Sequence, residues 1–306
     1  MLGPVLFILY INDIVNCSDL LSFILFADDT TLLFSCKVFG QLNQIINVQL
    51  AKVSDWLKAN KLSLNTKKTN FILFGNKRTG SVAGTTFSIV IDGNAIEQVD
   101  HAKFLGVVLD AKLNWKKHIE YIALKISRGL AVIGRLRNIL PRNVLLMLYY
   151  TMIYPHLTYC NLIWGAARPT VLRKLVCLQK RALRLITRST FRSSSNPLFV
   201  SLTLLKLSDI NIYQIAQFMF KIKHCLLPVS CLRYVTVADS KRFHLTRNVP
   251  FFSMAGCRTV IREHSVSICG PRVWDSLTKE IQESKSLASF KRAFVKQVVA
   301  SYASFI

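Results

Sequence analysis

The stretch Leu20-Leu21-Ser22-Phe23-Ile24-Leu25-Phe26-Ala27-Asp28-Asp29-Thr30-Thr31-Leu32-Leu33-Phe34 decides how the first part of this chain folds. Two apolar runs of strand length flank a short acidic segment, which predicts a buried hairpin with Asp28-Asp29 at its tip. Two ionised carboxylates beside a core are costly unless a cation or hydrogen bonds compensate, so the pair suggests a site for a divalent metal. The alternative is a plain turn built from good turn-forming residues.

The composition indicates a folded chain with an uneven charge distribution. Of its 306 residues, 51% are hydrophobic, which is ample for the cores of two or three domains. The net charge is +24, yet residues 1–110 carry nine Lys/Arg against nine Asp/Glu, whereas residues 111–306 carry 31 against 7. A neutral first part followed by a basic remainder suggests that the protein binds a polyanion. The basic part would hold it and the neutral part would act on it.

No membrane segment or zinc site is predicted. The apolar runs are shorter than the roughly 18 residues that span a bilayer, and the apolar start lacks the features of a signal peptide. The eight cysteines form no Cys-x-x-Cys pair, so we expect free thiols in a reducing compartment, nucleus or cytoplasm. Cys257, His264 and Cys269 mix ligand types, but their spacing is unlike that of a zinc knuckle.

Residues 1–118 are predicted to mix helices with short strands. Apolar spacing predicts a helix over residues 39–60, with Trp56 on or beside its apolar face, and a shorter helix is expected over residues 4–14. The expected elements that follow are strands at 69–74, 87–91 and 104–109, a loop at 75–84, a turn at Asp92-Gly93 and a close backbone approach at Gly106.

From Lys116 onward the pattern becomes helical. Its apolar positions recur at intervals of three and four residues: Ile119, Ile122, Ala123, Ile126, Leu130, Ile133 and Leu136. Further helices are predicted over residues 142–153, between Pro141 and Pro155, and over residues 170–187. Beyond them we expect a linker at 189–196, a helix at 210–226, an irregular or β-rich region at 229–262 and a closing helix at 286–299.

The helix predicted over residues 170–187 has the clearest electrostatic pattern. Leu172, Leu175, Gln179, Ala182 and Ile186 follow one face, and a second face carries basic side chains: Arg173, Lys174, Lys180, Arg181, Arg184 and Arg188. A charge run is usually a solvated face. Because no acidic residue between Glu120 and Asp209 offsets the repulsion, we favour a face that contacts phosphate groups.

Several blocks, in the right order, resemble the reverse transcriptases of non-LTR retrotransposons, particularly the jockey-like group. The blocks are Leu2-Gly3-Pro4-Val5-Leu6-Phe7-Ile8-Leu9-Tyr10-Ile11-Asn12-Asp13-Ile14, Phe26-Ala27-Asp28-Asp29-Thr30, Trp56–Thr69, Phe104–Asp110, Leu113–Ile119, Tyr154–Tyr159 with Trp164-Gly165, and Gly270–Leu277. The resemblance covers nearly the whole chain. It implies an α+β fold: the C-terminal part of a palm, an antiparallel sheet with helices, in residues 1–118, a basic helical thumb in 119–190, and a basic C-terminal region of unassigned role in 191–306.

The resemblance also implies an activity and a site. An RNA-directed DNA polymerase uses an RNA template, a DNA primer, deoxynucleoside triphosphates and Mg²⁺ or Mn²⁺, and Asp28 and Asp29 would hold the metals for two-metal nucleotidyl transfer. Lys68, at the lysine position of the family, would approach the triphosphate. The residues expected to contact substrate or primer are Phe26, where the family often has tyrosine, Ala27, Phe104, Leu105 and Gly106. The alternatives are a core aromatic for Phe26, a surface lysine for Lys68 and plain sheet core for Phe104, Leu105 and Gly106.

The departures from the family pattern bear on activity. The chain begins inside the first block, so we expect the family's third metal-binding aspartate, the fingers and the start of the palm to be absent; neither Asp13 nor Asp19 matches that position. The chain is then an N-terminally truncated fragment that does not polymerise alone. The alternative is a catalytically dead basic protein that binds nucleic acid. A purely structural protein would bind nucleic acid weakly and with little salt dependence, contrary to the charge distribution.

Overall fold

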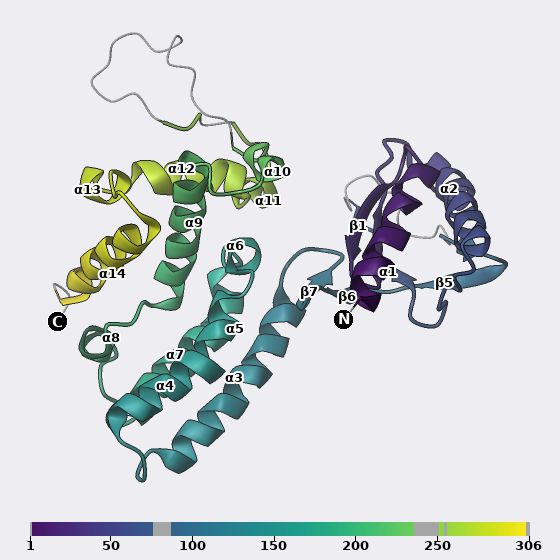
Figure 1. Cartoon of the computed structure of the whole chain (residues 1–306). Helices are drawn as coiled ribbons and strands as arrows, with labels where there is room; N and C mark the ends of the chain where they lie inside the picture. Colours follow the sequence, from purple (N-terminus) through teal and green to yellow (C-terminus); the bar gives the residue numbers. More distant parts are fainter. Residues whose placement is uncertain (1, 76–86, 236–250, 254–255, 304–306) are drawn as a thin grey trace, which may run out of the picture. The chain divides into compact units, whose positions relative to one another are not determined.

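The chain forms two compact units, Met1–Leu113 and Asn114–Ile306 (Figure 1). The computed structural model describes residues 2–75, 87–235, 251–253 and 256–303. Each unit has its own hydrophobic core, and small sheets occur together with many helices. The α+β class expected from the sequence is confirmed at this level, whereas the functional division into palm, thumb and C-terminal region stays a prediction.

Unit 1 combines helices with short strands. Its elements are α1 (Gly3–Ile11), the 3-10 helix η1 (Asn12–Cys17), β1 (Ser22–Phe26), β2 (Asp29–Leu33), α2 (Phe39–Ala59), β3 (Asn70–Phe71), β4 (Ile89–Ile91), β5 (Asn94–Gln98), β6 (His101–Phe104) and β7 (Val107–Asp110). The buried face of α2, with Ile46, Leu50 and Val53, packs on η1 and β4 and forms the core with Ile14 and Ile89. Trp56 is half-buried against this core, as its predicted position required.

In the described part of unit 1, the strands form three small sheets instead of one antiparallel sheet. β1 pairs with β2 and β6 pairs with β7, both antiparallel. The third sheet has the order β3-β5-β4, in which β3 runs parallel to β5. A parallel pair is possible here because the connection from β3 to β5, which includes β4, is long enough for a crossover. The predicted loop at 75–84 falls, apart from its first residue, outside the described residues.

Two-residue turns close the β1–β2, β4–β5 and β6–β7 hairpins. The predicted Asp92-Gly93 turn is confirmed, with φ of +52° and +73°, as a type I′ hairpin turn requires. The predicted single strand over 104–109 is wrong. Leu105 and Gly106 also have positive φ, +43° and +85°, and reverse the chain between β6 and β7. Gly106 therefore supplies a left-handed turn position.

Unit 2 is built from helices. They are α3 (Lys116–Leu136), α4 (Arg142–Met152), α5 (Tyr154–Thr158), α6 (Asn161–Trp164), α7 (Pro169–Thr187), α8 (Asn196–Leu202), α9 (Leu207–Lys223), α10 (Val229–Leu232), α11 (Val260–Glu263), α12 (Val266–Asp275), α13 (Lys279–Gln282) and α14 (Leu287–Ala303). Within the described residues, none of the helices of the chain is both long and apolar enough to cross a membrane.

Most of the predicted helices are confirmed, and the errors concern short elements. The helices expected at 39–60, from 116 on, at 142–153, 170–187, 210–226 and 286–299 are present within a few residues. The helix expected over 4–14 ends at Ile11, and Pro155 lies in the first turn of α5. The predicted linker at 189–196 is confirmed up to its last residue, where α8 begins, and the described parts of region 229–262 are irregular, as expected, apart from the short helices α10 and α11.

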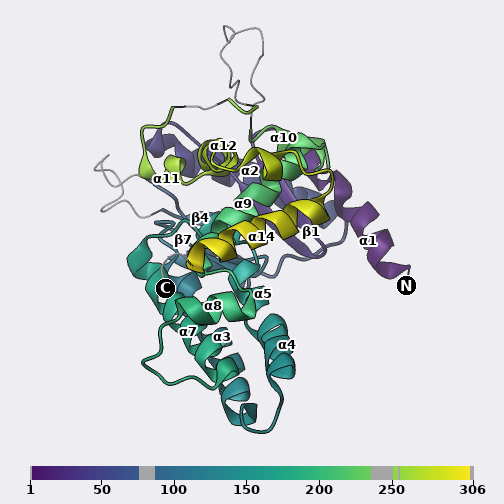
Figure 2. The ribbon, with the colours of Figure 1, turned by 90° about the vertical axis from the view of Figure 1, so that its left-hand side faces the viewer.

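The apolar faces of α3 and α7 pack against each other and start the core of unit 2. Ile126 and Ile133 of α3 and Ala182 of α7 are fully buried in this contact region, as their periodicity predicted. Farther along the chain α12 packs on α9, and α14 lies across α8 and α9, which both views show (Figures 1 and 2). Trp274 of α12 packs its ring beside Phe290 of α14, with ring centres 6.3 Å apart.

Gln179 is the polar residue that joins three parts of the unit 2 core. Its side chain is buried on the inner face of α7. The amide nitrogen donates to the Tyr149 hydroxyl at 3.1 Å and to the Leu205 carbonyl at 2.9 Å, and the amide oxygen accepts from the Leu207 backbone nitrogen at 3.0 Å. Each of these partners is in a buried residue, so Gln179 connects α7 to α4 and to the start of α9.

We predict that Gln179→Ala lowers the free energy of unfolding by about 2–4 kcal/mol, because it leaves buried polar groups without partners and opens a cavity. Urea denaturation followed by tryptophan fluorescence measures the change. Gln297→Ala, on the exposed side of α14, is the matched control and should change the free energy by less than about 0.5 kcal/mol. Equal effects of the two substitutions would contradict the role of Gln179.

Candidate functional site

Asp28 and Asp29 lie at the tip of the β1–β2 hairpin. Ala27 and Asp28 form the two-residue turn, and Asp29 begins β2 opposite Phe26. Ala27 has a φ of +51°, the left-handed conformation that the first central residue of such turns needs and that a β-carbon disfavours. Strained turns of this kind are often found at functional sites, and here the strain lies next to the two carboxylates.

The hairpin is exposed rather than buried, which corrects the sequence-based expectation. Phe23, Leu25 and Leu32 pack against the core of unit 1, whereas Ile24 and Phe26 on the other face are exposed, Phe26 by 60%. Apolar residues occupy both faces of β1, but only one face meets the core of unit 1. The two carboxylates therefore do not need a cation to offset burial, and Phe26 is not a core aromatic.

The two carboxylates still suit a hard divalent cation. Both side chains are exposed at a tight turn, so their oxygens are accessible from solvent. Mg²⁺ is commonly bound by one or two carboxylates, with water and substrate phosphates completing the coordination. Within the described ranges, no three Asp, Glu, His or Cys side chains gather in a metal-binding arrangement. The pair thus fits a site that is shared with a phosphate-bearing substrate.

The remaining residues predicted for unit 1 lie on two other turns. Lys68 is exposed in a turn after α2, where its backbone nitrogen donates to the Asn65 carbonyl at 3.1 Å. Phe104, Leu105 and Gly106 are half-buried at the β6–β7 turn. Their proposed contacts with triphosphate and primer stay predictions.

The basic face predicted on α7 divides into two groups. Arg173, Lys174 and Arg181 are exposed and Lys180 is half-buried. The other two arginines hold the loops at the end of the helix. Arg184 donates to the Ser193 carbonyl from Nε and Nη2 at 3.2 and 3.0 Å, and Arg188 donates to the carbonyls of Arg137 and Leu140 at 2.9 and 3.2 Å.

A cavity of about 300 Å³ between α3 and α7 adds a basic residue that the sequence reasoning missed. Its walls are Ser127, Leu130, Ala131, Gly134, Arg135, Arg181 and Leu185. Two guanidinium groups at one small hollow favour an anionic group such as a phosphate. The available signal was the pair of small residues, Ala131 and Gly134, one turn apart on the helix that carries Arg135.

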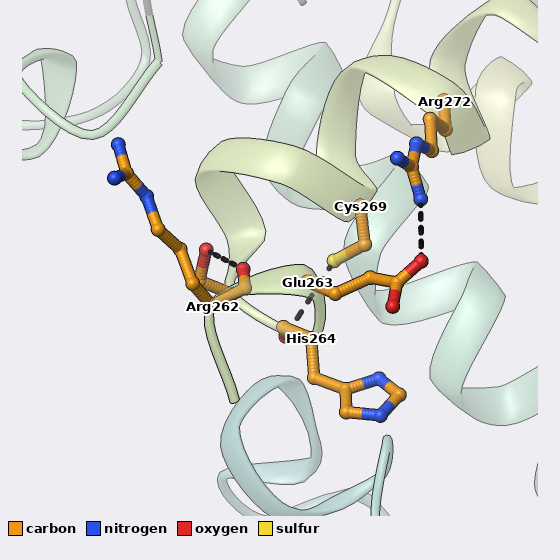
Figure 3. Close-up of polar contacts among 6 residues, drawn as sticks. Arg262, Glu263, His264, Cys269 and Arg272 are labelled. Carbon is orange, nitrogen blue, oxygen red and sulfur yellow. Dashed lines mark hydrogen bonds and ion pairs between the residues drawn. The ribbon is translucent and has the colours of Figure 1, made fainter. Parts of the chain in front are cut away.

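The residues considered for zinc are not arranged as a ligand set. The thiol of Cys269 faces the backbone carbonyl of His264 at 3.8 Å, while the His264 imidazole points away from it (Figure 3). Beside them Glu263 forms an ion pair with Arg272 at 3.1 Å (Figure 3). Burial raises the pKa of the Cys269 thiol, which disfavours the thiolate form that binds zinc.

Unit 1 is similar in sequence to a known family of enzymes. Residues 1–109 match the family described as reverse transcriptase (RNA-dependent DNA polymerase). This range ends in β7 and includes all three hairpins of unit 1, with the Asp28-Asp29 turn. No solved structure matches the chain significantly.

The curated relatives are RNA-directed DNA polymerases of non-LTR transposons. The chain is 27% identical over 194 residues to a probable RNA-directed DNA polymerase from transposon X-element of Drosophila melanogaster, an alignment that covers 61% of this chain and 21% of the relative. It is 28% identical over 222 residues to the RNA-directed DNA polymerase from mobile element jockey of the same species, covering 68% and 23%. The chain therefore spans about a fifth of the length of these relatives, and the resemblance inferred from the sequence is confirmed.

We predict that Ala27→Gly stabilises the β1–β2 hairpin by about 1 kcal/mol, because glycine adopts positive φ without strain. Hydrogen exchange of the backbone amides over residues 22–33 measures the effect. Ala95→Gly, at an exposed position within β5, is the control and should instead destabilise its hairpin by about 0.5–1 kcal/mol. A loss of protection at both sites would show that Ala27 is not strained.

Proposed function

We propose that this chain works in RNA-directed DNA synthesis by a non-LTR retrotransposon, with metal-binding carboxylates in unit 1 and nucleic-acid-binding helices in unit 2. One observation carries the proposal. The residues that match reverse transcriptases include two adjacent carboxylates at the tip of the β1–β2 hairpin, one in its turn and one at the start of β2. The substrates would be an RNA template, a DNA primer and deoxynucleoside triphosphates.

In this proposal the hairpin holds Asp28 and Asp29 at a fixed separation, because one is in the turn and the other is paired with Phe26. Bound Mg²⁺ or Mn²⁺ would make the primer 3′-hydroxyl nucleophilic and neutralise the leaving pyrophosphate. The exposed ring of Phe26 offers an apolar surface to the primer end. Lys68 offers a positive charge to the triphosphate.

Two carboxylates on one turn hold a pair of ions from one side only, so we propose that the chain by itself does not extend a primer. The test is a primer-extension assay with the purified chain, an RNA template and Mg²⁺ or Mn²⁺. Template-dependent extension that Asp28→Asn abolishes would overturn this part of the proposal and establish a complete site. Extension that Asp28→Asn leaves unchanged would contradict the role of the turn itself.

We predict that replacing both turn carboxylates, Asp28→Asn and Asp29→Asn, weakens Mn²⁺ binding roughly tenfold, because two negative charges in contact with the ion are lost. Electron paramagnetic resonance of free Mn²⁺ measures the affinity. Asp19→Asn, just before the hairpin, is the control and should leave the affinity unchanged. If the control has as large an effect as the pair, the turn is not the binding site.

A second candidate function, nucleic-acid binding without catalysis, rests on a separate observation. The exposed side of α7 presents Arg173, Lys174 and Arg181, and no acidic residue lies between Glu120 and Asp209 to neutralise them. Such a surface binds phosphate groups through counterion release. In the polymerase proposal the same surface holds the template and primer, so its test is independent of the metal site.

We predict that Arg173→Ala with Lys174→Ala lowers the affinity of the chain for nucleic acid. Each lost phosphate contact should reduce the slope of log affinity against log salt by about 0.7–0.9. The measurement is fluorescence anisotropy of a labelled strand at several salt concentrations. Lys279→Ala with Lys285→Ala removes the same charge at two exposed sites and should change neither quantity. If the basic face of α7 is only solvated, both double variants will have the same affinity for nucleic acid and the same salt dependence as the unsubstituted chain.

A further inference from the structure

Phe191 has the most exposed large apolar side chain among the described residues, at 83%. It lies in the loop between α7 and α8. The guanidinium of Arg184 lies over its ring, 5.9 Å from the ring centre, within the range of a cation–π contact. With one face covered in this way and most of the side chain in water, the opposite face is open to a planar partner.

The support under this ring is itself held in place. Arg184 donates two hydrogen bonds to the Ser193 carbonyl, so its guanidinium bridges the helix and the loop that carries Phe191. The hydroxyls of Thr190 and Ser193 form a hydrogen bond of 2.8 Å, which closes the loop segment that contains Phe191. Single exposed apolar side chains are common and need no explanation. Phe191 differs because a fixed cation supports it.

The surroundings of Phe191 are basic. Fourteen Lys/Arg and no Asp/Glu lie between Glu120 and Asp209. Arg188 binds the carbonyls of Arg137 and Leu140, which joins the α3–α4 loop to the end of α7. The cavity with Arg135 and Arg181 lies between α3 and α7. An accessible aromatic face within a positively charged surface suits a ligand that has both a planar π system and an anionic backbone.

We propose that Phe191 is a stacking platform for an unpaired nucleobase, so that this end of unit 2 binds single-stranded nucleic acid in preference to a duplex. The proposal rests on the nucleic-acid binding proposed for unit 2 and adds the strand type and the residue that contacts the base. Phosphate contacts alone do not discriminate in this way, whereas a base inside a duplex has no free face to offer. Stacking on an aromatic ring is tolerant of base identity.

The experiment measures the affinity of the full chain, by fluorescence anisotropy, for three oligonucleotides of equal length. They are a single strand of uridines or thymidines, the same backbone with abasic sites, and a duplex. Phe191→Ala should weaken binding to the single strand about tenfold and leave binding to the abasic strand and the duplex unchanged. Phe191→Trp should retain or improve the affinity for the single strand.

Ile139→Ala is the control, because Ile139 is 74% exposed on the α3–α4 loop and has no aromatic ring. It should leave all three affinities unchanged. An unchanged affinity of Phe191→Ala for the single strand, or an equal loss for the abasic strand, would overturn the stacking platform and leave nucleic-acid binding by unit 2 intact. If the unsubstituted chain binds none of the three oligonucleotides, the proposed binding function of unit 2 fails first.

Discussion

The packing of α3 on α7 is the interaction on which the rest of unit 2 depends. Both helices carry basic side chains, and Glu120 is the only acidic residue within them. Burial of a side chain such as Ile126 or Ile133 contributes about 1.5–3 kcal/mol, whereas a pair of like charges on a helix surface costs only a few tenths of a kcal/mol. The apolar contact therefore prevails over the repulsion and holds the basic surface in place.

The basic residues at α7 have two different roles. Arg184 and Arg188 use their guanidinium groups on backbone carbonyls of the neighbouring loops, and so they shape the end of the helix. Arg173 and Lys174 face water and are available to phosphate groups. This division explains how a charge-rich helix both builds its unit and presents a surface, and it places Phe191 beside a fixed cation.

Unit 1 is organised by short hairpins with strained or glycine-containing turns. Its core is small and covers only one side of β1, and most side chains of the apolar helix α1 are exposed. The carboxylate pair is consequently held by turn geometry and strand pairing rather than by burial. A metal at this turn would be bound because the carboxylate oxygens are accessible from solvent, and not because the core requires a counter-charge.

The sequence by itself determined the long elements, the acidic turn and the family resemblance. Periodicity over twenty residues, as in α3, and the Asp92-Gly93 turn are local signals that need no tertiary partner. The tertiary structure alone decided which face of β1 is covered and that Arg184 lies over Phe191. These features depend on residues that meet only when the chain has folded, so no local pattern predicts them.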